Sequence, residues 1–299
     1  MGVVVRNQYT LLSPRPAVGR RRRRLFLGAI LLALLVVRPL SAQEPLGGGT
    51  VAGAKELANQ VNNPTEPITL LQLRGLFAPA WSGSSGGATA LETEFVLPIA
   101  RGRLIPVMQL TRTTIPYLWI PDEAGGVAGF GDLNYFDIGL IPTKWGRWGP
   151  GITMVIPTGA STTALTAGKW QLGPALAVII SSIPDLQFGL VLQNPISFAG
   201  PSERPDVNAL TISPTLTYNL PGGWFAGYSD FAMEFNWEDG GAATIPIGLQ
   251  VGKVLRLGKR PFVFSAEAAS LVARATDAEP KWVIGIEAAW VIKLHPGFR

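Results

Sequence analysis

Residues able to perform acid–base or nucleophilic catalysis are scarce in this sequence. The 299 residues include no cysteine and a single histidine, His295, close to the C-terminal end. A serine nucleophile needs a base such as histidine to accept its proton, and transition-metal sites are built from histidine and cysteine. We therefore expect no enzymatic activity, no metal site and no cofactor, and a barrel-embedded hydrolase is the least favoured function.

Carboxylates at alternate positions in apolar stretches are the other candidates for chemistry. Glu267 and Glu287 fall on neighbouring predicted strands at similar height, where two carboxyl groups can act as an acid–base pair or line the path of a solute. Arg112 is the candidate counter-charge. The same groups can also form an ion-paired plug in a narrow interior, and the sequence leaves lining and plug open. The candidate residues are Glu92, Glu94, Arg112, Asp132, Asp230, Glu234, Glu267 and Glu287.

The elements that must position these side chains are β-strands, because apolar and polar residues alternate with a period of two. In residues 281–293, Trp282 and Trp290 lie on an apolar face and Glu287 lies on the opposite face. In residues 230–238 one face consists of Phe231, Met233, Phe235 and Trp237, and the other of Asp230, Ala232, Glu234, Asn236 and Glu238. Such strands have one apolar face and one polar face.

Twelve strands of this kind follow one another. Their predicted ranges are 69–81, 89–99, 104–120, 129–142, 148–158, 169–182, 186–198, 207–220, 224–238, 243–257, 261–273 and 281–293. The connections alternate between longer loops, such as 159–168 and 199–206, and shorter turns, such as 100–103 and 221–223. Short periplasmic turns that alternate with long external loops are typical of outer-membrane barrels, and an even strand number places both termini in the periplasm.

The predicted fold class is therefore all-β: an antiparallel transmembrane β-barrel of about 12 strands, formed by residues 69–299. A charged side chain that faces lipid at mid-membrane costs about 2–4 kcal/mol, so we expect the candidate carboxylates to face the lumen. Tryptophans near strand ends, Trp282 and Trp290 among them, fit the aromatic girdles of such barrels. A soluble β-sandwich also alternates apolar and polar residues, but its strands are usually shorter than these.

The first 42 residues are predicted to be a cleavable signal peptide. Five arginines at 20–24 precede thirteen apolar or small residues at 25–37, and residues 40–42 offer small side chains before the cut. An uncleaved membrane anchor is the alternative, although a spanning helix needs about 20 apolar residues. Residues 43–68 are assigned to a periplasmic N-terminal segment.

The net charge of +5 originates in this leader. Residues 1–42 contain eight arginines and no acidic residue, which leaves 17 Lys and Arg against 20 Asp and Glu, a net charge of −3 for the remainder. A nucleic-acid partner is therefore not expected. Export to the outer membrane of a Gram-negative cell fits both the leader and the strands.

Several short segments together resemble a known family. They are ELANQVNNP at 56–64, LTRTTIP at 110–116, GFGDLN at 129–134, RPDVN at 204–208 and IPIG at 245–248. This set resembles the outer-membrane transporter family associated with the meta-pathway of phenol degradation, whose members are sometimes labelled neuromedin U. The resemblance covers residues 55–293 and implies a barrel that passes hydrophobic or aromatic small molecules. It supplies no functional residues that can be carried over.

The expected function is an outer-membrane channel or transporter for small, hydrophobic or aromatic solutes. Twelve strands give a pore between the filled small barrels and the aqueous porins of sixteen strands. The alternative is a structural or loop-display barrel with a closed lumen. The expected partners are outer-membrane lipid and lipopolysaccharide, the barrel-assembly machinery and a small-molecule solute.

Overall fold

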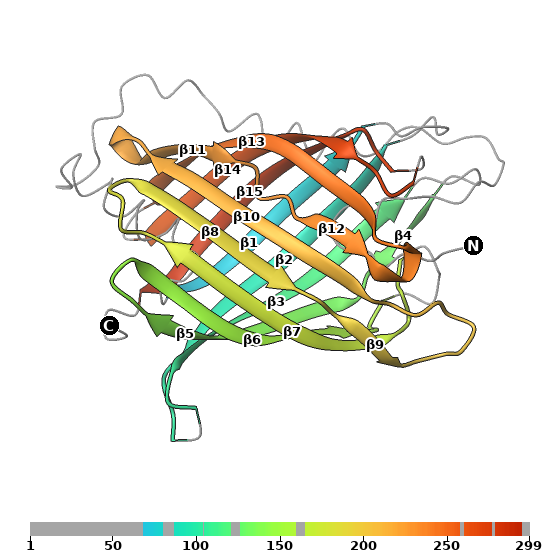
Figure 1. Ribbon diagram of the computed structural model, residues 1–299. Coiled ribbons are helices and arrows are strands. Elements are labelled where there is room, and N and C mark those ends of the chain that lie inside the picture. The colour runs from blue at the N-terminus through green and yellow to red at the C-terminus, as the bar shows by residue number, and fades with distance from the viewer. Residues whose placement is uncertain are drawn as a thin grey trace.

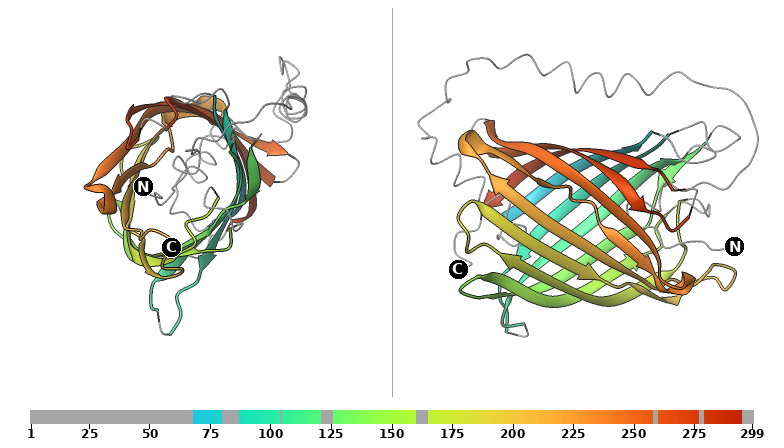
Figure 2. Two further views of the ribbon diagram at one scale, coloured as in Figure 1. Left: turned by 90° about the vertical axis from the view of Figure 1, so that its right-hand side faces the viewer. Right: turned by 45° about the horizontal axis from the view of Figure 1, so that its top comes forward.

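The protein is an antiparallel β-sheet closed into a barrel of twelve strands, as the computed structural model shows (Figures 1 and 2). The structure describes residues 68–79, 87–103, 105–120, 126–159, 165–257, 260–276 and 279–294. The predicted signal peptide 1–42, nearly all of the predicted segment 43–68, and His295 lie outside these residues. The predicted fold class is confirmed.

Nine of the twelve strands are continuous. They are β1 (Ile68–Ala78), β2 (Ala88–Ile99), β3 (Met108–Ile120), β6 (Gly146–Ile156), β7 (Trp170–Ile180), β10 (Ala209–Asn219), β13 (Ala242–Leu257), β14 (Arg260–Ala273) and β15 (Trp282–Leu294). The sheet closes because β1 pairs with β15 and β8 pairs with β10. The end-on view in Figure 2 shows the resulting ring. Among the described residues, no helix is both long and apolar enough to cross a bilayer.

The other three strands are interrupted, which corrects the continuous ranges 129–142, 186–198 and 224–238 of the sequence prediction. They consist of β4 (Val127–Phe130) with β5 (Leu133–Pro142), β8 (Leu186–Gln193) with β9 (Ile196–Ala199), and β11 (Trp224–Tyr228) with β12 (Met233–Asn236). Pro195 explains one break, because proline has no N–H to donate to the ladder. Asp132 explains another, because its side chain binds a loop, as described below.

One predicted turn is also wrong. The connection between β2 and β3 spans residues 100–107 rather than 100–103, and it projects beyond the wall at the lower left of Figure 1. Pro106 cannot donate a ladder hydrogen bond, and the Gly102 N–H donates to the Ile105 carbonyl at 2.8 Å. Strand β3 therefore begins at Met108, four residues later than predicted.

The outer face of the barrel is apolar and has aromatic residues near both ends. On β15, for example, Ile284 and Ile286 are exposed between Trp282 and Trp290. The exposed tryptophans of one end are Trp145, Trp148, Trp224 and Trp290, and those of the other are Trp170, Trp237 and Trp282. An apolar band between two aromatic girdles is the surface that a bilayer covers.

Candidate functional site in the barrel lumen

We name the two ends of the barrel by their connections. The turn end carries residues 100–107, 143–145, 181–185 and 220–223, and the loop end carries 79–87, 157–169, 200–208 and 274–281. Between the two ends, charged side chains from six different places in the chain meet inside the lumen at mid-height. This central belt consists of Arg74, Glu92, Glu94, Arg112, Asp230, Glu267 and Glu287.

Arg74 of β1 organises the central belt. Its guanidinium forms an ion pair with Glu267 of β14 and lies 4.0 Å from a carboxylate oxygen of Glu92. It also donates to the Asp230 carbonyl at 3.3 Å, and it lies over the ring of Phe231, 5.1 Å from the centroid. Arg74, Glu92 and Glu267 are all buried. One cation therefore neutralises carboxylates from the neighbouring strand β2 and from β14, two strands away on the other side of β1.

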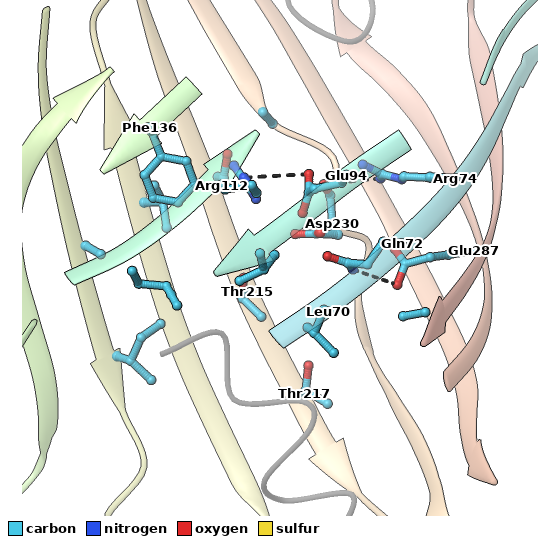
Figure 3. Close-up of a pocket in the computed structure, with 18 of the residues that line it drawn as sticks. Leu70, Gln72, Arg74, Glu94, Arg112, Phe136, Thr215, Thr217, Asp230 and Glu287 are labelled. Carbon is cyan, nitrogen blue, oxygen red and sulfur yellow. Dashed lines mark hydrogen bonds and ion pairs between the residues drawn. The ribbon is translucent and has the colours of Figure 1, made fainter. Parts of the chain in front are cut away.

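A second cation, Arg112, lies on β3, two strands away from Arg74. Its guanidinium lies 3.6 Å from Glu94 of β2 and 4.5 Å from the ring centroid of Phe136 on β5. Gln72 of β1 donates to Glu287 of β15 at 3.1 Å. Figure 3 shows these pairs pointing toward each other across neighbouring strands. With two guanidinium groups and five carboxylates, the central belt has a formal charge of −3 when all its groups are ionised.

A cavity of about 230 Å³ extends from the central belt toward the turn end. About half of its lining is polar and half is apolar, and the apolar residues gather on the side toward the turn end. Leu70, Leu110, Leu140, Val191 and Val263 contribute aliphatic side chains from five strands. The polar lining residues outside the belt include a row of hydroxyls on β10, formed by Thr211, Ser213, Thr215 and Thr217, together with Gln72, Gln193, Gln250 and Ser265. The apolar side chains toward the turn end differ from the polar lumen-facing side that the sequence predicted.

The loop end of the lumen is occupied by a cluster of fully buried apolar side chains. Leu76, Leu118, Leu165 and Phe231 have no exposed surface, and they pack with smaller residues of β2, β14 and β15. Leu165 reaches this cluster from the loop between β6 and β7, and Phe231 reaches it from the break between β11 and β12. Phe231 was predicted to face outward, and the inward course of residues 229–232 is the reason that it does not.

Two candidate residues lie away from the cavity. Glu234 is buried on β12, between its register partners Thr211 and Thr244. Asp132 is buried between β4 and β5 at the loop end, where it accepts hydrogen bonds from the Thr166 hydroxyl, the Gly159 N–H at 3.2 Å and the Ala167 N–H at 2.9 Å. Asp132 thus fastens the β6–β7 loop instead of lining the solute cavity.

Replacing Asp132 with alanine is expected to loosen this loop while leaving the barrel folded. The loop N–H groups and the Thr166 hydroxyl lose their acceptor, which costs about 1–3 kcal/mol for buried groups. Faster hydrogen exchange at residues 157–168 would report the loss. The control is Asp206→Ala, because the fully exposed Asp206 carboxylate is a weak anchor. Unchanged exchange in Asp132→Ala would contradict the assignment.

Two further contacts of the loop end involve Asp206, which is exposed, and Glu279, which is buried. Lys169 donates to Asp206 at 3.1 Å, and this hydrogen bond and charge lower the pKa of the Asp206 carboxyl. Burial raises the pKa of Glu279, although the Thr244 hydroxyl, which donates to it at 2.7 Å, opposes the rise. Within the described residues, no group of three or more acidic or histidine side chains is placed to hold a metal ion.

Sequence reasoning missed two central residues, Arg74 and Gln72. Both lie on the same face of β1, opposite the exposed Leu73 and Phe77. The cost of a lipid-facing charge applies to Arg74 as it does to the carboxylates, so this signal was present in the sequence. The candidates that the structure brings around Arg74 are Glu92, Glu94, Arg112, Asp230, Glu267 and Glu287.

The arrangement of strands is similar to that of known outer-membrane proteins. An outer membrane channel from Pseudomonas putida F1 matches with a TM-score of 0.54 and 11% sequence identity, over 77% of this chain and 98% of that chain. The NanC porin matches with a TM-score of 0.50 and 10% identity, over 75% of this chain and 100% of the porin. No protein-family model and no curated protein matches the sequence.

The chain has the fold of an outer-membrane β-barrel. This fold, together with the apolar outer face and its two aromatic girdles, places the protein in the outer membrane.

Proposed function

We propose that this barrel passes small, apolar or aromatic solutes across the outer membrane without chemical change. The observation that carries the proposal is the group of apolar side chains that lines the cavity on the side toward the turn end. Water-filled porins have polar interiors, whereas this lumen presents Leu, Ile and Val side chains from several strands. A solute that is itself apolar gains from contact with such a wall.

The size of the cavity fits this solute class. An apolar cavity of about 150 Å³ is sufficient to bind benzene, so 230 Å³ accommodates a small substituted or fused aromatic ring. The hydroxyls of Thr215 and Thr217 and the carboxylate of Asp230 lie at the edge of the cavity. They can receive one polar substituent of an otherwise apolar ring. We assign the lining residues of the central belt to this role, which agrees with the aromatic solutes implied by the family resemblance.

Uptake of radiolabelled naphthalene tests the proposal. Cells with an intact lipopolysaccharide leaflet are compared with and without the full-length protein, and radiolabelled glycerol serves as the hydrophilic solute. We expect the protein to accelerate naphthalene uptake and to leave glycerol uptake nearly unchanged. Equal acceleration of both solutes would indicate a general pore, and acceleration of neither would indicate a structural barrel with a closed lumen.

The excess of carboxylates in the central belt makes a separate prediction about ions. A negative lining attracts cations and repels anions, so any ion current through the folded barrel is expected to be carried mainly by cations. Glu287→Gln changes the formal charge of the belt from −3 to −2 and should reduce this preference. The reversal potential under a KCl gradient in a planar bilayer measures both effects. An anion preference in the unmodified protein would refute the charge argument.

A further inference from the structure

The wall of the barrel is interrupted at mid-height between β10 and β13. Strand β11 pairs with β10 only as far as Gly227 opposite Thr217, and β12 resumes at Met233 opposite Ile212. Pairing with β13 has the same break, since β11 ends at Tyr228 and β12 resumes at Glu234. In the register of these described strands, residues 229–232 therefore make no ladder pair with either neighbour.

Two prolines flank the break. Pro214 lies on β10 between the residues that pair with β12 and those that pair with β11, and Pro246 occupies the corresponding stretch of β13. Proline has no backbone N–H group. At Pro214 and Pro246, therefore, neither strand has an N–H donor that would need an acceptor in the break. In a wall that faces hydrocarbon, where water cannot satisfy backbone groups, this makes the break tolerable.

The segment 229–232 is held by contacts other than a ladder. The Ser229 N–H donates to the Gly248 carbonyl at 3.1 Å, and the Tyr228 hydroxyl donates to the Pro246 carbonyl at 2.5 Å. On the lumen side, the Asp230 N–H donates to Glu267 at 2.9 Å. Arg74 also donates to the Asp230 carbonyl, so the segment is drawn inward and is held by contacts with side chains of the central belt rather than by a paired ladder.

The lumen-facing and lipid-facing sides of the break also differ in polarity. Inside, Ser213, Thr215, Asp230 and Ala232 line the cavity. Outside, Leu216 on β10 is 42% exposed, and Ile247 and Leu249 on β13 are 52% and 75% exposed, on the surface that faces lipid. A single stretch of four residues thus separates the solute cavity from the core of the bilayer.

We propose that residues 229–232 form a lateral gate through which an apolar solute passes between the cavity and the bilayer core. The inference rests on the proposed function and adds the route of exit. Phe231 of this segment also belongs to the apolar cluster at the loop end of the lumen, so displacement of the segment would withdraw Phe231 from that cluster. An apolar solute gains more by entering hydrocarbon than by entering periplasmic water. Outward displacement of the segment would open this path without dismantling any paired strand.

The absence of cysteine from the sequence permits a direct test. Leu216→Cys with Ile247→Cys places two lipid-facing thiols on either side of the break, about 12 Å apart, because Ile247 lies two strand spacings away and two residues along β13 from the level of Leu216. A lipid-soluble bismaleimide of that length links β10 to β13 covalently across residues 229–232. The matched control is Tyr218→Cys with Val251→Cys, since both residues are 50% exposed and are separated by the paired part of β11.

The readout is the entry of phenylnaphthylamine, which fluoresces on reaching a membrane interior, into cells that carry the full-length protein. Mass spectrometry of the purified protein measures how much is bridged. We expect bridging across the gate to reduce entry to the rate of cells without the protein and bridging across β11 to leave it unchanged. Equal rates in the two bridged proteins would overturn the lateral gate while leaving the proposed function standing. If no form accelerates entry, the proposed function itself is wrong.

Discussion

Replacing Arg74 with methionine is expected to destabilise the barrel more than any other single substitution in the lumen. The guanidinium is 7% exposed and contacts Glu267, Glu92 and the Asp230 carbonyl together. Methionine fills much of the same volume but leaves these carboxylates without their cation. Removing one partner of a buried ion pair costs about 3–5 kcal/mol, because the remaining charge stays buried and uncompensated.

Urea unfolding of the protein in lipid vesicles, followed by tryptophan fluorescence, measures this loss as a lower midpoint. Arg256→Met is the control, because Arg256 is exposed near the turn end of β13 and surface substitutions change stability by about 0.5 kcal/mol or less. The double variant Arg74→Met with Glu267→Met should recover part of the loss, since it removes one of the stranded charges. Equal midpoints for Arg74→Met and the unmodified protein would show that the belt does not depend on Arg74.

Filling the cavity is expected to abolish solute uptake without unfolding the barrel. Val191 on β8 lines the cavity and retains some exposed surface, so a larger side chain has space to enter. Val191→Trp places an indole where the solute is proposed to lie. The adjacent residue Leu190 belongs to the opposite face of the strand, so Leu190→Trp adds the same ring on the lipid side.

We expect naphthalene uptake to fall to the background rate in Val191→Trp and to remain normal in Leu190→Trp. Resistance of the folded barrel to unfolding by detergent on a gel shows that both variants are folded. If Val191→Trp is folded and transports normally, the cavity is not on the solute path.

The face of each strand that points to lipid could be predicted from the sequence, because lipid and lumen favour different residue types at alternate positions. On β15, Trp282, Ile284 and Trp290 are exposed and Glu287 faces the cavity, as the alternation predicts. A one-residue shift would have turned Glu287 toward lipid. The predicted number of twelve strands is correct for the same reason, whereas the predicted start of β3 and the predicted length of the connection before it were wrong.

Two of the three interruptions could not be predicted from the sequence, because distant contacts determine them, whereas Pro195 at the break between β8 and β9 is visible in the sequence. Phe231 continues the apolar alternation of Met233 and Phe235 and was assigned to the outer face. Its actual position follows from Arg74 and Glu267, which hold residue 230 inside the lumen from strands far away in the sequence. The alternation likewise places Asp132 on a lumen-facing position. In the structure, however, its carboxylate accepts hydrogen bonds from loop N–H groups that lie 27 and 35 residues later in the sequence.

The most direct test of the central claim is to locate a bound aromatic molecule in the folded protein. Crystals of the barrel soaked with bromobenzene would show the bromine by its anomalous scattering. The account predicts a bromine site inside the lumen, among Leu140, Val191 and Val263, that disappears in Val191→Trp. Bromine found only on the lipid-facing surface, with none in the lumen at saturating concentration, would contradict the claim that the cavity receives apolar solutes.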